Sequence, residues 1–87
     1  MNDEDIDLFD FPCEFSLKVM GKSADDFEVL IVKIVRRHCQ DLGAVTTRSS
    51  KGGKYMSVTV AITAQSRIQL DALYTELSGH ERVVMVL

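Results

Sequence analysis

The fold can be worked out from residues 55–64, which read YMSVTVAITA. Large apolar side chains fall at the even positions from Met56 to Ile62, and small or hydroxyl-bearing residues fill the odd positions between them. This alternation is typical of a β-strand that buries one face and leaves the other uncovered. The stretch therefore predicts a sheet with a single packed layer behind it.

Three further strands are expected around this one. Phe15, Leu17 and Val19 alternate with polar residues up to Gly21, which predicts a strand of the same one-sided kind. Residues 45–50 suggest a more polar strand of edge character, joined to residues 55–64 by a turn at residues 51–54. Residues 82–87 predict a last strand that is apolar on both sides.

Two amphipathic helices separate the strands. We expect the first to begin after Ser23 as N-cap, with Asp25 and Asp26 at the positive end of the helix dipole, and to close at Gly43. The second has a capping box at Ser66 and Gln69. The apolar stripes comprise Phe27, Leu30, Ile31, Ile34, Val35 and His38 in the first helix, and Leu70, Leu73, Tyr74 and Leu77 in the second, which ends at Gly79.

The element order β-α-β-β-α-β predicts an α+β fold, the ferredoxin-like two-layer sandwich. Right-handed crossovers place the first and third strands in the middle of an antiparallel sheet of order 4-1-3-2, with both helices on one side. The other side of the sheet stays open. The residues expected on it are Ser16, Lys18, Met20, Ser57, Thr59, Ala61, Thr63, Val84 and Val86.

Length and composition exclude several classes of protein. A chain of 87 residues and 9.7 kDa holds one domain, and no apolar run approaches the roughly 20 residues of a membrane-spanning helix. The acidic start has the wrong sign for a signal peptide, so we expect a cytoplasmic protein without membrane contact. Cys13 and Cys39 suit neither a disulfide framework nor a zinc site, so both are expected to be reduced thiols, with no metal and no cofactor.

Charge is distributed unevenly along the chain. Residues 1–10 contain five acidic residues and no basic one, whereas residues 11–87 contain 10 basic and 8 acidic residues, a net charge of +2. We expect residues 1–10 to form an acidic flexible tail and residues 11–87 to form the domain. A nearly neutral domain lacks the basic stripe of a nucleic-acid-binding protein, and its open face lacks the stacking aromatics of RNA-binding sheets. The sequence therefore argues against nucleic acid as a partner.

The order and spacing of several short motifs resemble those of the YbeD-like family of bacterial proteins. The motifs are Phe11-Pro12, Lys18-Val19-Met20-Gly21, Arg37-His38, Ser49-Ser50-Lys51-Gly52, Tyr55 with Ser57-Val58-Thr59, Leu73-Tyr74 and Val84-Met85-Val86-Leu87. The resemblance covers residues 9–87 and implies a ferredoxin-like fold close to ACT regulatory domains, with no established activity. One departure is the hairpin, where Gly53 and Lys54 make the turn one residue longer than in the family pattern.

Two loops are candidate ligand sites. Gly21, with Lys22, Ser23 and Ala24 at the start of the first helix, resembles the place where ACT-like domains admit an amino acid, and backbone N–H groups there suit a carboxylate. The alternative is a plain strand-to-helix turn, which we favour because Asp25 and Asp26 oppose an anion.

The second loop is the hairpin. Ser49, Ser50, Lys51, Gly52, Gly53 and Lys54 fit a small anion nest, although a solvated hairpin explains the same residues. His38 and Cys39 adjoin, but neighbours on a helix point apart, so a capping or core-edge histidine is favoured over a catalytic pair.

Taken together, the sequence predicts a non-catalytic regulatory or adaptor module. Because the last strand is apolar on both sides although it lies at an edge, we expect a protein partner or a second copy to bind the edge or the open face. The expected interface residues are Val84, Met85, Val86, Leu87, Thr59 and Ala61. The alternatives are sensing of a small amino acid or carboxylate, and, less favoured, RNA binding.

Overall fold

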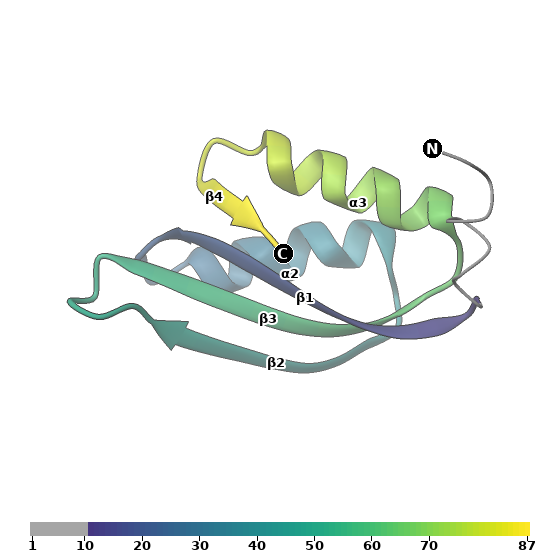
Figure 1. Cartoon of the computed structure of the whole chain (residues 1–87), viewed down its shortest axis with the longest axis horizontal. Helices are drawn as coiled ribbons and strands as arrows, with labels where there is room; N and C mark the ends of the chain where they lie inside the picture. Colours follow the sequence, from purple (N-terminus) through teal and green to yellow (C-terminus); the bar gives the residue numbers. More distant parts are fainter. Residues whose placement is uncertain (1–10) are drawn as a thin grey trace.

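The structure is a computed structural model that describes residues 11–87, so the predicted acidic tail lies outside the described residues. The elements follow the predicted order (Figure 1). They are β1 (Cys13–Lys22), α2 (Phe27–His38), β2 (Leu42–Ser49), β3 (Tyr55–Ala64), α3 (Arg67–Gly79) and β4 (Val83–Val86). The predicted β-α-β-β-α-β arrangement is confirmed.

The four strands form one antiparallel sheet of order β2-β3-β1-β4, which is the predicted 4-1-3-2 order counted from the other edge. Its longest pairing joins β1 to β3 without interruption, from Cys13 opposite Ala64 to Lys22 opposite Tyr55. Both strands have alternating apolar residues, so this register brings their apolar faces to the same side of the sheet.

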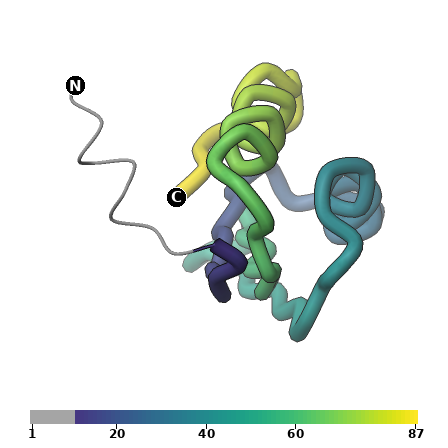
Figure 2. The backbone as a smooth tube through the Cα atoms, turned by 90° about the vertical axis from the view of Figure 1, so that its right-hand side faces the viewer, coloured from purple at the N-terminus to yellow at the C-terminus, as the bar shows by residue number. Residues whose placement is uncertain are grey.

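The core lies between that side of the sheet and the two helices. Figure 2 shows α2 and α3 next to each other on the same side of the strands. The buried apolar side chains are Leu17, Val19, Phe27, Ile31, Ile34, Val35, Cys39, Val58, Val60, Ile62, Ala64, Leu70, Leu73 and Leu77. In the part of the chain that the structure describes, neither helix is long and apolar enough to cross a membrane.

The first helix differs from its prediction at both ends. It begins at Phe27 with Asp26 as N-cap, and the backbone N–H of Ser23 donates to the carbonyl of Lys54 in the β2–β3 hairpin, so Ser23 is not the cap. It ends at His38, and Gly43 lies within β2. The strand starts early because Leu42 already pairs with Ile62 of β3, and this pairing is stronger than the local preference of glycine for a helix end.

The N-terminus of α3 confirms half of the predicted capping box. The Ser66 hydroxyl accepts from the backbone N–H of Gln69 at 3.1 Å, but the Gln69 side chain accepts from the backbone N–H of Gln65 rather than from that of Ser66. The same amide donates to the carbonyl of His38 at 2.7 Å. Gln69 thereby connects the start of α3 to the end of α2.

Gly21 is required by close packing at the end of β1. An added Cβ there would overlap the carbonyl oxygen of Arg82 and lie 2.6 Å from the Phe27 ring. The Arg82 guanidinium also lies over that ring, 5.9 Å from its centroid, and forms two hydrogen bonds to the Asp26 carboxylate at 2.7 and 3.0 Å. Glycine at this position lets β1, α2 and the segment before β4 meet.

We expect Gly21→Ala to lower the free energy of unfolding by about 1–3 kcal/mol, because overpacking displaces a fixed backbone oxygen and a buried ring. Urea unfolding measures the change. The matched control is Gly79→Ala at the end of α3, where an added Cβ would have no neighbour within 4 Å. Equal destabilisation by the two substitutions would contradict the role given to Gly21.

Candidate interaction surfaces

The side of the sheet opposite the helices is open among the described residues. Even-numbered side chains of β1 and odd-numbered side chains of β3 project from it, since Leu17 and Val60 face the core. The predicted interface residues Thr59 and Ala61 both lie on this face and are half-buried. Lys18, opposite Thr59, projects from the same face and is exposed. The prediction of an open, mixed surface therefore holds for β1 and β3.

This face is more basic than the sequence analysis indicated. Arg48 of β2 stands opposite Ser57 and projects from the same side as Lys18 and Lys22 of β1. Arg48 was not among the expected site residues, and only the register of β2 against β3 places it here. Lys18, Arg48, Ser57 and Leu87 line a hollow of about 210 Å³.

One predicted side-chain orientation, in the edge strand β4, is wrong. Val83 pairs with Gly21 and Met85 with Met20, so two steps along β4 match one step along β1 and a bulge interrupts the alternation. The Val86 side chain consequently faces the core opposite Val19, where it is half-buried, and it does not lie on the open face as predicted. Met85 and Leu87 take the open-face positions expected for Val84 and Val86.

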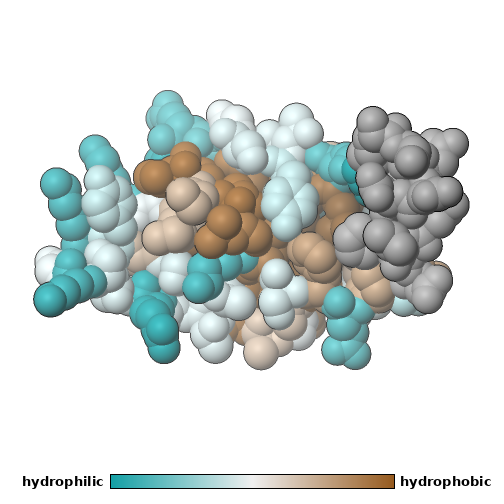
Figure 3. All heavy atoms as spheres, viewed as in Figure 1, coloured by the Kyte–Doolittle hydropathy of each residue, from teal (hydrophilic) through white to brown (hydrophobic). Residues whose placement is uncertain are grey.

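The apolar surface is concentrated at this edge. Val84, Met85 and Leu87 are 60%, 48% and 59% exposed, whereas the other exposed large apolar residues, Val29 and Ile68, stand singly on the helices. Figure 3 shows the corresponding hydrophobic surface around β4, with hydrophilic residues toward the hairpin. A cluster of this kind marks a contact more often than scattered residues do.

The hairpin forms a tight turn, and some of its polar groups already form hydrogen bonds within the turn. Gly52 and Gly53 have φ values of +89° and +75°, which explains both glycines. The N–H of Gly53 donates to the carbonyl of Ser50, and the Ser50 hydroxyl accepts from the N–H of Tyr55. Lys51 and Lys54 are exposed. The nest predicted at Ser50, Lys51, Gly52 and Lys54 stays a prediction, with fewer free donors than expected.

The other predicted ligand site lies at the turn between β1 and α2. Lys22, Ser23 and Ala24 line a hollow of about 230 Å³, and its other lining residues are Glu81, Arg82 and Val84. The hydrogen bonds from Arg82 lower the pKa of the Asp26 carboxyl, so the Arg82 guanidinium is already paired, and Glu81 beside Lys22 would repel a carboxylate. The Phe27 ring and the Arg82 carbonyl occupy the space beside Gly21. The carboxylate site stays a prediction, and the geometry favours the plain turn.

One polar cluster joins the two helices. Glu76 of α3 accepts a hydrogen bond from Arg37 and lies 2.6 Å from Nε2 of His38, both at the end of α2. Hydrogen bonding lowers the pKa of the Glu76 carboxyl, and Arg37 makes the larger contribution, followed by His38. The neighbouring Cys39 is buried, and its thiol points to the carbonyl of Thr63 at 3.3 Å. His38 therefore acts as a core-edge residue, as the helical spacing indicated.

We expect Glu76→Gln to reduce the free energy of unfolding at neutral pH by up to about 1 kcal/mol, the range of partly exposed ion pairs. Because pairing lowers the folded-state pKa, this contribution is present above the ordinary value of 4.5 and is lost as pH falls through the lower folded-state pKa. Urea unfolding at several pH values should show the two proteins converging in acid. Glu14→Gln, at a carboxylate without an ion pair in residues 11–87, is the control, and a pH-independent difference would contradict the assignment.

Comparison with known structures supports the fold. The solution structure of protein HP0495 from Helicobacter pylori matches with a TM-score of 0.69 and 17% identity, covering 91% of this chain and 85% of that one. The ACT domain from the GTP pyrophosphokinase of Chlorobium tepidum matches with a TM-score of 0.68 and 11% identity, covering 85% and 94%. At these identities the likeness shows an ACT-like fold alone.

Sequence comparison shows closer relatives. The chain is 48% identical to a UPF0250 protein of Chromobacterium violaceum, with 100% of both chains covered, and 48% identical to one of Paraburkholderia phytofirmans, with 92% of both covered. A UPF0250 protein of Neisseria gonorrhoeae is 43% identical over 92% of this chain and 90% of its own length. The model of a protein family of unknown function, DUF493, matches residues 7–87. The chain therefore belongs to the DUF493 family of bacterial proteins of unknown function.

Proposed function

We propose that this protein is a cytoplasmic, non-catalytic regulatory or adaptor module that associates through the β4 edge of its sheet, with a second copy of the chain as the partner. The observation that carries the proposal is the exposure of Val84, Met85 and Leu87 on a strand with no neighbour on its outer side among residues 11–87. An apolar edge of this kind favours pairing with another strand.

The backbone of β4 suits such pairing. Lys18 and Leu87 exchange two backbone hydrogen bonds, at 3.1 and 2.8 Å, so the backbone groups of Leu87 point toward β1. Adjacent residues of an antiparallel strand point their N–H and C=O groups to opposite edges, and those of Val86 therefore point outward. A second β4, related by a two-fold axis, would accept and donate hydrogen bonds there and complete an eight-stranded sheet.

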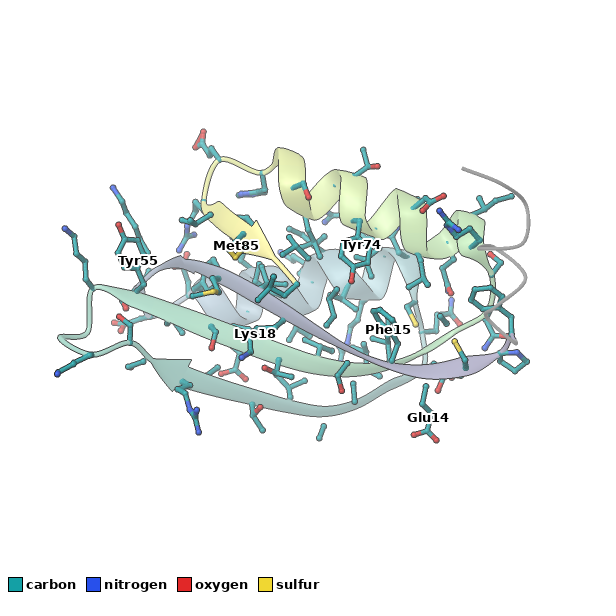
Figure 4. All side chains as sticks on the ribbon, in the orientation of Figure 1. Glu14, Phe15, Lys18, Tyr55, Tyr74 and Met85 are labelled. Atoms are coloured by element: carbon teal, nitrogen blue, oxygen red, sulfur yellow. The ribbon has the colours of Figure 1, made fainter. Side chains whose placement is uncertain are left out.

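The free edge extends beyond β4 itself. The strand has four residues, whereas β1 has ten, and the pairing of β1 with β4 begins at Val19, with Lys18 hydrogen-bonded to Leu87. Phe15, in the half of β1 that β4 does not pair with, and Tyr74 of α3 are both half-buried (Figure 4). Burial raises the pKa of the Tyr74 hydroxyl. A paired copy would add cover to this region as well as to β4.

A non-catalytic role is supported by the ion pairs that the charged side chains form with one another. Glu76 is held by Arg37 and His38, and Arg82 is held by Asp26. These groups connect helices and turns at the surface of the core. His38 also lines a hollow of about 350 Å³ with Cys39 and Asp41, but its Nε2 already lies 2.6 Å from the Glu76 carboxylate. Their positions fit structural roles in a binding module.

We expect Val84→Lys and Met85→Lys, combined, to shift a dimer to a monomer in size-exclusion chromatography with light scattering, because two charges on each edge repel and must be desolvated on pairing. Ile68→Lys, on α3 and 81% exposed, is the matched control and should leave the dimer unchanged. A wild-type protein that stays at the 9.7 kDa of one chain at high concentration would contradict self-association through this edge.

A further inference from the structure

The open face of the sheet has an unbalanced positive charge. Lys18 and Lys22 of β1 and Arg48 of β2 project from it, and none of the three forms an ion pair within residues 11–87. Glu14 is the acidic residue on this face in the described chain, and it lies opposite Thr63 at the far end of β1 (Figure 4). Lys18 and Arg48 line the hollow on this half of the face, whereas Lys22, at the end of β1, also borders Glu81 at the β1–α2 turn.

Apolar and hydroxyl groups lie between these cations. Ser57 stands between Arg48 and Met20, and Thr59 stands next to Lys18. Met20 also pairs with Met85 of β4, and Leu87 lies beside Lys18 at the rim of the 210 Å³ hollow. Such a surface fits an acidic peptide segment in which apolar side chains alternate with carboxylates.

The first ten residues of the chain have this composition. They contain Asp3, Glu4, Asp5, Asp7 and Asp10 without a basic residue. Ile6, Leu8 and Phe9 are interleaved with these acids. Their charge of −5 complements the net +2 of residues 11–87, whose unpaired cations include the three on the open face. Charge and apolar content therefore match between segment and face.

The segment is also long enough. Ten extended residues span up to roughly 33 Å, and Lys18 is five residues, roughly 17 Å, along β1 from Cys13. A contact within the same chain has a high effective concentration, so weak individual ion pairs suffice.

The exposed side of α2 is a less suitable binding surface for residues 1–10. Lys33 and Arg36 line a hollow there, but Glu28 lines it too and would repel a carboxylate. The neighbouring Arg37 is already paired with Glu76. The open face, with three unpaired cations at one end, is the better match.

We propose that residues 1–10 dock on the basic open face of their own chain, over Lys18, Lys22 and Arg48. The apolar residues of the segment contact Met20, Met85 and Leu87, and its carboxylates neutralise the cations. This contact covers the open-face sides of Met85 and Leu87 and leaves free the backbone edge of Val86, through which a second β4 would pair.

The test compares two full-length proteins by ¹H–¹⁵N NMR: the wild type and a variant in which the acids of residues 1–10 are changed to amides (D3N, E4Q, D5N, D7N, D10N). We expect the changes in chemical shift outside residues 1–10 to concentrate at Lys18, Arg48, Ser57 and Thr59. They should not depend on protein concentration, and salt should weaken the contact in the wild type. Amides of residues 3–9 should have order parameters above the flexible range of about 0.6 in the wild type.

Matched charge reversals identify the face. Lys18→Glu with Arg48→Glu should release the segment and reproduce the low order parameters of the amide variant. Lys33→Glu with Arg36→Glu, on α2, should not. Release by the α2 pair alone, shift changes confined to the helices, or a flexible segment in the wild type would each overturn the proposal. Shift changes that grow with concentration would replace it with a contact between chains.

Discussion

The pairing of β1 with β3 is the constraint on which the rest of the structure depends. Ten consecutive residues of each strand are in register, from Cys13 opposite Ala64 to Lys22 opposite Tyr55. Because side chains alternate along a strand, a slip of one residue would put Leu17 and Val19 on the opposite side of the sheet from Val58 and Val60, so one of the two pairs would leave the core. One register therefore fixes the core, the open face and the positions of both edges.

The two layers of the fold then determine where a partner can bind. The helices cover one side of the sheet and are joined by Gln69 and by Glu76 with its two partners. Gly21 lets the Phe27 ring and the Arg82 carbonyl close the end of β1, so the turn there is filled by the protein's own atoms. Among the described residues, the opposite side of the sheet and the short strand β4 differ in character: Lys18 and Arg48 make the first basic at one end, and the second is apolar.

The fold could be predicted from the sequence because strand alternation and helical stripes are both strong here. The errors arise where tertiary pairing overrides local preference. Gly43 was expected to end a helix but lies in β2, since Leu42 already pairs with β3, and Ser23 donates its N–H to the hairpin instead of capping α2. The inward turn of Val86 depends on the bulge between β1 and β4, which no local pattern shows. Arg48 joins the open face only through the register of β2.

Amide hydrogen exchange at Val86 tests the central claim most directly. Its N–H points away from β1, where residues 11–87 offer no strand to bond, so in an isolated chain it should exchange rapidly. If two copies pair through this edge, Val86 should be protected, and its protection should increase with protein concentration while that of Val19 in the sheet interior stays constant. Rapid exchange at Val86 at every concentration would contradict the account.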